Sequence, residues 1–320
     1  MAQWKETGVS EKKLKLLVSG GDLVRVRYGF YATKEILARA AEDPPLAHAI
    51  QVAAVRAASM RGGVASHHSA ARMHGIELLH PPEEDVVTLT VPPGRQWGRH
   101  GPRGVVRHAA QLAEGHVTTL YGLPVTVAAR TVADIARTST FMQGVVVADS
   151  ALRKRLTLKP DMQAVLEDCK RWPGIDLARR VAEFADWAPE SVLESCARVV
   201  FREQGLPPPL LQVPLLGRGG AFAARVDFCW PDFGTVAETD GMAKYETHDD
   251  LKDQYHRDTR IQDAGWEVVH FSWKELFSDP AGIIARIRAA FERGLEPSAT
   301  KRRESVPQAA VGLRQDGAGT

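Results

Sequence analysis

The stretch RVDFCWPDFGTVAETDG, residues 225–241, predicts a β-hairpin with strands over residues 221–230 and 235–240. Three acids lie within this hairpin: Asp227, Glu238 and Asp240. Carboxylates are usually kept out of strands that face a core, because burying a charge without a partner is costly. The hairpin is therefore either open to solvent or arranged around a cation.

The spacing of the three acids favours the cation. Glu238 and Asp240 are two residues apart on one strand, so their side chains leave the same face, and Asp227 on the partner strand lies opposite them. We expect the three carboxylates to converge on one point. Like charges so close raise one another's pKa unless a divalent ion with a preference for oxygen ligands, Mg²⁺ or Mn²⁺, lies among them. Lys244 is a candidate to bring a positive charge to the same place.

The elements on either side of the hairpin predict further acids at this site. A helix capped at Ser191 precedes it, and a helix ending at Gly265 and a strand follow. Glu194 is an acid within an apolar helical pattern, so it is a candidate site residue. In the later helix Arg257 and Arg260 are expected to point away from the sheet. The stripe expected to face the sheet contains Leu251, Tyr255, Asp258 and Gln262.

The C-terminal third of the chain resembles a known nuclease domain. The segments SVLES (191–195), RVDF (225–228), ETDG (238–241), KY (244–245) and HRDTRIQDAGWEVVHFSW (256–273) are similar to the short-patch-repair-endonuclease-like domain of the PD-(D/E)XK superfamily. The resemblance implies that Asp227, Glu238 and Glu194 bind metal. It also implies that the helix carrying Asp258, Arg257 and Arg260 supports the site and contacts phosphate. The implied chemistry is hydrolysis of a phosphodiester by a metal-activated water.

The sequence departs from the superfamily pattern at one position. The residue two after Glu238 should be Lys, but it is Asp240. Lys244 could supply the missing charge from a displaced position. Asp227, Glu238, Asp240 and Lys244 are thus the candidate catalytic residues, while Asp227, Glu238, Asp240 and Glu194 are the candidate metal ligands.

The N-terminus predicts a winged helix-turn-helix. GVSEKKLKLLVSGGDLVRVRYGFYA, residues 8–32, predicts a helix capped at Ser10 and a two-stranded wing. Lys12 and Lys15 on the helix, with Arg25 and Arg27 projecting from the wing, are the candidate DNA contacts.

The N-terminal half resembles a second known family. The N-terminal segment, SHHSAARMHGI (66–76) and LPVTVAARTVADIA (123–136) are together similar to AbiEi-type antitoxins and transcriptional regulators. That resemblance implies an autorepressor in a type IV toxin-antitoxin or phage-defence operon, with a cognate toxin as its partner.

Composition bounds the whole chain. Its 320 residues allow two or three domains, and its apolar and charged fractions are those of a soluble globular protein. The three widely spaced cysteines argue against a disulfide framework, and the sequence shows no apolar run long enough for a membrane span, so we expect a cytoplasmic protein. Residues 1–40 hold eight basic residues against four acids, whereas residues 227–263 hold ten acids against four basic residues.

The predicted fold is multidomain α+β. It consists of a winged helix-turn-helix (1–42), a mixed α/β middle segment (43–158), a restriction-endonuclease-like domain with a central mixed sheet flanked by helices (185–296) and a disordered tail (297–320). Two functions remain open. One is a DNA-binding, metal-dependent endonuclease; the other is a non-catalytic DNA-binding antitoxin or autorepressor.

Overall fold

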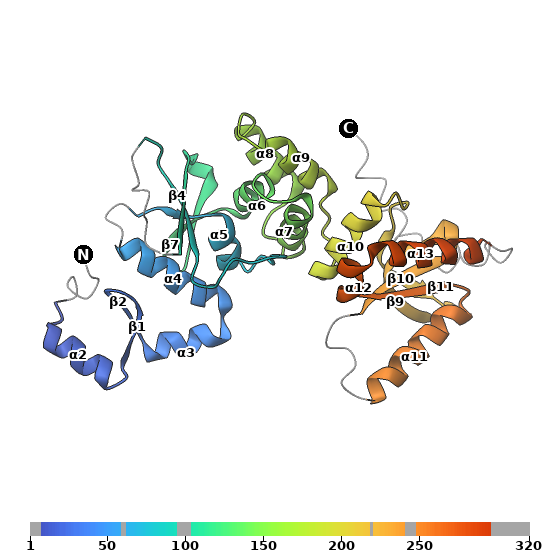
Figure 1. The fold of residues 1–320 in the computed structure, drawn as a ribbon, viewed down its shortest axis with the longest axis horizontal. Coiled ribbons are helices and arrows are strands. Elements are labelled where there is room, and N and C mark those ends of the chain that lie inside the picture. Colours follow the sequence, from blue (N-terminus) through green and yellow to red (C-terminus); the bar gives the residue numbers. More distant parts are fainter. Residues whose placement is uncertain (1–7, 59–61, 95–103, 218–219, 241–247, 296–320) are drawn as a thin grey trace. The chain divides into compact units, whose positions relative to one another are not determined.

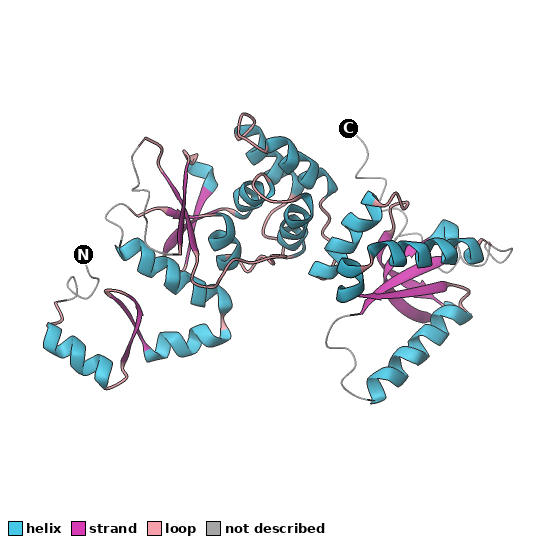
Figure 2. Ribbon diagram, in the orientation of Figure 1, coloured by secondary structure: helices cyan, strands magenta, loops and turns pink. Residues whose placement is uncertain are grey.

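The computed structural model describes residues 8–58, 62–94, 104–217, 220–240 and 248–295. It divides into two compact units, residues 1–187 and 188–320. Both combine helices with sheets, which confirms the predicted α+β class (Figures 1 and 2). Lys244 and the predicted disordered tail lie outside the described residues.

The described part of the first unit, from residue 8, begins with a helix, a hairpin and two further helices. The Ser10 hydroxyl accepts a hydrogen bond from the Lys13 amide and caps the first helix as predicted. Gly29, with φ at 77°, supplies the turn between the strands. Ala32 and Ala40 share a core with Leu46 and Ile50. The elements are α2 (Glu11–Ser19), β1 (Leu23–Arg27), β2 (Phe30–Thr33), α3 (Lys34–Glu42) and α4 (Pro44–Ala58).

A five-stranded sheet follows in the order β5-β4-β3-β7-β6. β4 and β5 are parallel, β3 and β7 are parallel, and the other two pairs are antiparallel. Apolar residues of α4 and α5 form a core with Leu89 and Val125 of the sheet. The elements are β3 (Val64–Ala65), α5 (His67–Met73), β4 (Val87–Val91), β5 (Val105–Ala109), η1 (Glu114–His116), β6 (Val117–Leu120) and β7 (Leu123–Thr126).

Four helices complete the first unit. Every residue of α6 is buried, so its polar side chains need partners within the protein. Arg130 is the one arginine of that helix, and its guanidinium pairs with the Asp134 carboxylate at 2.9 Å. The elements are α6 (Ala128–Ala136), α7 (Phe141–Arg153), α8 (Lys159–Asp168) and α9 (Ile175–Phe184).

The second unit contains a four-stranded mixed sheet in the order β11-β10-β9-β8. β8, β9 and β10 are antiparallel neighbours, and β11 runs parallel to β10. The central mixed sheet predicted for this region is therefore confirmed. The elements are α10 (Val192–Glu203), β8 (Leu210–Leu216), β9 (Phe222–Trp230), η3 (Pro231–Phe233), β10 (Thr235–Asp240), α11 (His248–Asp263), β11 (Glu267–Ser272), α12 (Trp273–Ser278) and α13 (Pro280–Gly294).

Helices cover both faces of this sheet (Figure 1). On one face Phe201 of α10 packs edge-on against Phe228, Trp230 and Phe271, with ring centroids 5.1 to 5.8 Å apart. On the other face Ile261 of α11 is fully buried in the core of the sheet. These two packing layers hold the ends of β8, β9 and β10 in fixed positions.

Two glycines shape the turn between β9 and β10. Gly234 has φ at 54°, a left-handed conformation that suits glycine. Gly294 of α13 lies so close that an added Cβ would be 1.8 Å from the carbonyl oxygen of Phe233. The turn is thus fixed against the end of α13.

No helix in the described part of the chain is long and apolar enough to cross a membrane.

Candidate functional site

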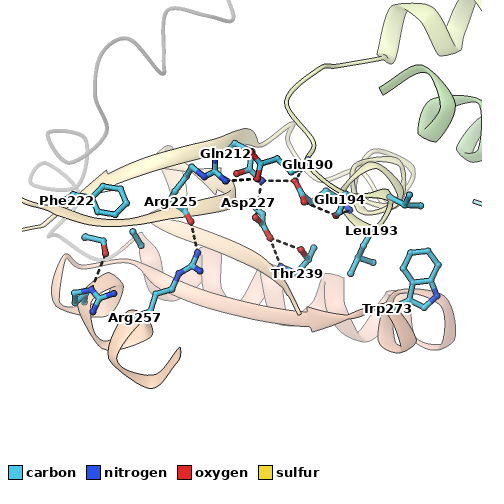
Figure 3. A pocket seen from close by; sticks show the side chains of 15 residues that line it. Glu190, Leu193, Glu194, Gln212, Phe222, Arg225, Asp227, Thr239, Arg257 and Trp273 are labelled. Carbon is cyan, nitrogen blue, oxygen red and sulfur yellow. Dashed lines mark hydrogen bonds and ion pairs between the residues drawn. The ribbon is translucent and has the colours of Figure 1, made fainter. Parts of the chain in front are cut away.

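A pocket of about 710 Å³ opens in the second unit where α10, β8, β9 and α11 meet (Figure 3). Its wall combines carboxylates, guanidinium groups and aromatic rings. The lining residues used below are Glu190, Glu194, Gln212, Phe222, Arg225, Asp227, Thr239, Arg257, Arg260 and Trp273.

Glu194 and Asp227 share one amide in this wall. The Gln212 side-chain nitrogen donates to Glu194 Oε2 at 2.7 Å and to Asp227 Oδ1 at 3.1 Å. Glu194 is 5% exposed. Burial raises the pKa of Glu194, and the negative charge of Asp227 raises it further, while hydrogen bonds from Glu190 and Ser191 oppose the rise. Two acids are therefore close together in a place that disfavours the charge of Glu194.

The local sequence fixes each of these side chains. Ser191 caps α10 by accepting from the Glu194 amide at 3.1 Å, and its hydroxyl donates to Glu194 Oε1 at 2.8 Å. Asp227 is held by Thr239, whose amide and hydroxyl both donate to Asp227 Oδ2, at 2.8 and 2.7 Å. Asp227 is thus bound to the neighbouring strand as well as to Gln212.

Glu238 is also buried, at 3% exposed, but its carboxylate turns to α11. Arg257 Nη2 donates to Glu238 Oε1 at 2.8 Å and to the Arg225 carbonyl at 2.6 Å. The expectation that Arg257 points away from the sheet is therefore wrong. α11 packs against β9 and β11, and Arg257 faces the sheet there, where the buried Glu238 carboxylate needs a cation.

Asp240 and Asp258 both contact His270. The imidazole Nδ1 lies 3.3 Å from Asp240 Oδ1, and Nε2 lies 3.1 Å from Asp258 Oδ2. Burial lowers the pKa of His270, but the hydrogen bond to Asp240 and the charges of Asp258, Asp240 and Glu238 raise it overall. The inward position of Asp258 is confirmed, yet Tyr255 on the same predicted stripe is 70% exposed. Among the α11 side chains that the structure describes, the buried one is Ile261, one turn after Arg257.

The expectation that the three hairpin acids converge on one point is therefore wrong. Their contacts divide them between Gln212 for Asp227, Arg257 for Glu238 and His270 for Asp240. Within the described residues no group of three or more His, Cys, Asp or Glu side chains is arranged to hold a metal ion. The paired strands of β9 and β10 end at Phe228 and Ala237, so the chains diverge just where the acids begin.

Glu194 and Asp227 nevertheless fit a magnesium ion by their chemistry. Mg²⁺ is commonly bound through one or two carboxylates and completes its coordination with water and substrate phosphate oxygens. Both carboxylates face one shared hydrogen-bond donor, and a cation there would relieve the repulsion that raises the pKa of Glu194.

Three arginines line the same pocket. Arg225 pairs with Glu190, Arg257 with Glu238, and the Arg260 Nε donates to the Ala223 carbonyl at 3.2 Å. Arg260 is exposed. These groups place positive charge beside the acid pair.

The sequence did not point to Gln212, Thr239, Arg225 or Trp273. Gln212 is the one polar residue in the strand LLQVPLL (210–216), and that interruption was the available signal. Its φ of 51° is unusual for a residue other than glycine. Thr239 and Trp273 carry no such signal, because a threonine in a strand and a tryptophan after a strand are ordinary.

The predicted DNA contacts lie in the first unit. Lys12, Lys15 and Arg25 are exposed, as is Lys13, and Lys15 forms an ion pair with Glu11 at 3.3 Å. Arg27 does not project from the hairpin as expected. Its Nε donates to Gln51 Oε1 at 3.2 Å and its Nη2 to the carbonyl of Asp85.

The curated proteins that this chain resembles in sequence are uncharacterized. No family model matches it. It is 29% identical over 286 residues to an uncharacterized protein of Mycobacterium tuberculosis, in both the CDC 1551 / Oshkosh and the H37Rv strains. The match covers 89% of this chain and 98% of each relative. Since neither unit alone contains 286 residues, the similarity extends over parts of both.

Proposed function

We propose that the second unit is a metal-dependent endonuclease that hydrolyses phosphodiester bonds of DNA, with Mg²⁺ or Mn²⁺ held by Glu194 and Asp227. The observation that supports this proposal is the pair of carboxylates on either side of the Gln212 amide in the wall of an open pocket. Acids gathered where burial and mutual repulsion raise a pKa are typical of functional sites. The resemblance to PD-(D/E)XK nucleases supports the same reading.

The side chains of the pocket would orient the metal ligands and bind the phosphate. When bound, the metal supplies an activated water and stabilises the charge that develops on the phosphate. Gln212 and Thr239 orient the Asp227 carboxylate, and Ser191 orients that of Glu194. Glu238 holds the Arg257 guanidinium at the pocket, where it and the exposed Arg260 bind the phosphate backbone.

The first unit would hold the molecule on DNA. Lys12, Lys15 and Arg25 are exposed cations on a helix and hairpin whose sequence resembles a DNA-binding winged helix. Such contacts to phosphates give affinity without sequence preference and weaken as salt rises. Arg27 would instead fix the hairpin to α4 and to the Asp85 carbonyl.

One observation favours a second function. Asp240 stands where the nuclease superfamily has a catalytic lysine, and His270 is its partner. A site without that lysine fits a DNA-binding antitoxin or autorepressor of a toxin-antitoxin or phage-defence operon, in which the second unit binds DNA or a cognate toxin without cleaving it.

Nicking of supercoiled plasmid tests the first function. Purified protein is incubated with plasmid in Mg²⁺, in Mn²⁺ and in EDTA, beside Glu194→Ala, Asp227→Ala and Glu238→Ala. Glu203→Ala, an exposed acid on the same helix as Glu194, is the matched control. We expect metal-dependent nicking that is lost in Glu194→Ala and Asp227→Ala and kept in Glu203→Ala.

The opposite result is equally clear. If neither metal supports cleavage of the plasmid or of a single-stranded circle while a salt-sensitive gel shift shows that the protein binds DNA, the endonuclease proposal is rejected. The antitoxin or autorepressor function then becomes the better account. Nicking that survives both Glu194→Ala and Asp227→Ala would show that a contaminant or another site is responsible.

A further inference from the structure

The pocket has aromatic side chains at both of its ends. Phe222, the first residue of β9, is 67% exposed, although a phenylalanine is usually buried. Trp273, the first residue of α12, is half-buried and lies against Phe277 with ring centroids 5.0 Å apart. Figure 3 shows Phe222 and Trp273 at opposite ends, with Asp227 and Glu194 between them.

Cationic groups lie between the acid pair and Phe222. Arg225 and Arg257 occupy that part of the wall in Figure 3, and Arg260 also lines the pocket. Guanidinium groups bind phosphates, and aromatic rings bind the faces of nucleobases. The pocket therefore offers partners for the backbone and for the bases of one strand.

Base pairing determines whether the bases of a nucleic acid can stack on Phe222 and Trp273. In a duplex both faces of each base are covered by its neighbours, so an aromatic side chain meets only groove edges or backbone. Bases of a single strand can separate and stack on a protein ring. A pocket with an aromatic ring at each end and phosphate-binding groups between suits an unpaired strand that crosses the acid pair.

We propose that this pocket binds an unpaired DNA strand, with bases stacked on Phe222 and on Trp273. The substrate of the site is then single-stranded DNA or a locally unpaired segment of duplex. This inference rests on the proposed endonuclease for the cleavage it implies, but the binding of a single strand can be measured without cleavage.

Fluorescence anisotropy of a labelled oligonucleotide in EDTA provides the test. The full-length protein is titrated against the strand alone, against the strand annealed to its complement, and against a strand of the same length with abasic sites. Phe222→Ala and Trp273→Ala are compared with the wild type. Phe222→Tyr and Trp273→Phe retain a ring, and Trp187→Ala removes another exposed tryptophan, 64% exposed, which is not among the described residues that line the pocket.

We expect the single strand to bind more tightly than the abasic strand, and we expect the alanine variants to leave duplex binding unchanged. Each alanine variant should weaken single-strand binding by about 5- to 100-fold, the range expected for loss of one stacked base. The ring-retaining variants and Trp187→Ala should bind as the wild type does. Phosphate contacts from the first unit favour the duplex, whose charge density is higher, so the abasic strand is the comparison that isolates the two rings.

Two results would overturn the inference. One is a single strand that binds no more tightly than the abasic strand, and the other is unchanged single-strand affinity in both alanine variants. Nicking of duplex plasmid without strand preference would reject this inference and leave the endonuclease standing. Ring-dependent binding of the single strand without cleavage in Mg²⁺ or Mn²⁺ would confirm the ligand and reject the endonuclease.

Discussion

Acidification should destabilise the first unit through two buried histidines. His48 is 4% exposed and His67 is 2% exposed. His48 Nε2 lies 2.8 Å from Ser69 Oγ, and the His67 ring stacks on His108 with centroids 3.8 Å apart. Burial, and after it the charge of Arg72, lowers the pKa of His48 to about 4. Burial, and after it His108, lowers the pKa of His67 to about 2.

The direction of the effect follows from proton binding. Below the unfolded-state pKa of 6.5 the unfolded chain holds protons that the folded unit does not accept. Stability is therefore complete above pH 6.5 and falls as the pH falls, down to about 4 for His48 and about 2 for His67. Each histidine contributes about 1.4 kcal/mol per pH unit in that window. Between about pH 7 and about pH 5 the two together remove about 4 kcal/mol.

Hydrogen exchange of the amides of α4 and β4, measured by mass spectrometry, reports the opening of this unit. Because carboxylates also titrate in this range, the informative quantity is the difference between wild type and the double variant His48→Gln/His67→Asn. Asn is chosen because His67 has φ at 50°, a conformation that Asn tolerates. The double variant should lose about 4 kcal/mol less than the wild type between the two pH values.

His80→Gln provides the control, because the His80 side chain is exposed and belongs to the same unit. Its opening free energy should follow that of the wild type at both pH values. If the double variant loses as much stability as the wild type on acidification, the two buried histidines are not the groups that couple protons to folding, and the reasoning fails.

Three other outcomes follow from packing and charge. Phe201→Ala should lower the free energy of unfolding of the second unit by about 3–5 kcal/mol, because Phe201 is 1% exposed and packs on three rings. Urea denaturation measures this loss, and a loss below about 1 kcal/mol would show that neighbouring side chains fill the cavity. Gly294→Ala should lower the free energy of unfolding by at least about 2 kcal/mol, measured by thermal unfolding, because the added Cβ would meet the Phe233 carbonyl oxygen. Gly115→Ala is the comparison, because a Cβ added at Gly115 would meet no other atom within 4 Å. In a gel shift, the slope of log Kd against log salt concentration should be about 2 smaller for Lys12→Ala/Lys15→Ala than for the wild type. An unchanged slope would show that α2 does not contact DNA.

The sequence by itself determined several element ends and the hairpin of the second unit. The caps of α2 and α10 at Ser10 and Ser191, and the hairpin of β9 and β10, follow from local chemistry, because a capping hydroxyl or a two-residue alternation acts within a few residues. The same patterns placed Glu194 and Asp227 as candidate site residues, since an acid in an apolar pattern needs a partner.

Only the tertiary structure decided which partner each acid has. Arg257 lies opposite Glu238 because α11 packs across the sheet, and periodicity along a helix does not say at what angle it will cross. Asp227 joins Gln212 and Glu194 rather than Glu238 because β9 and β10 stop pairing at Phe228 and Ala237. The pocket itself is built from α10, β8, β9, β10, α11 and the start of α12, whose meeting is set by the packing of side chains far apart in the sequence.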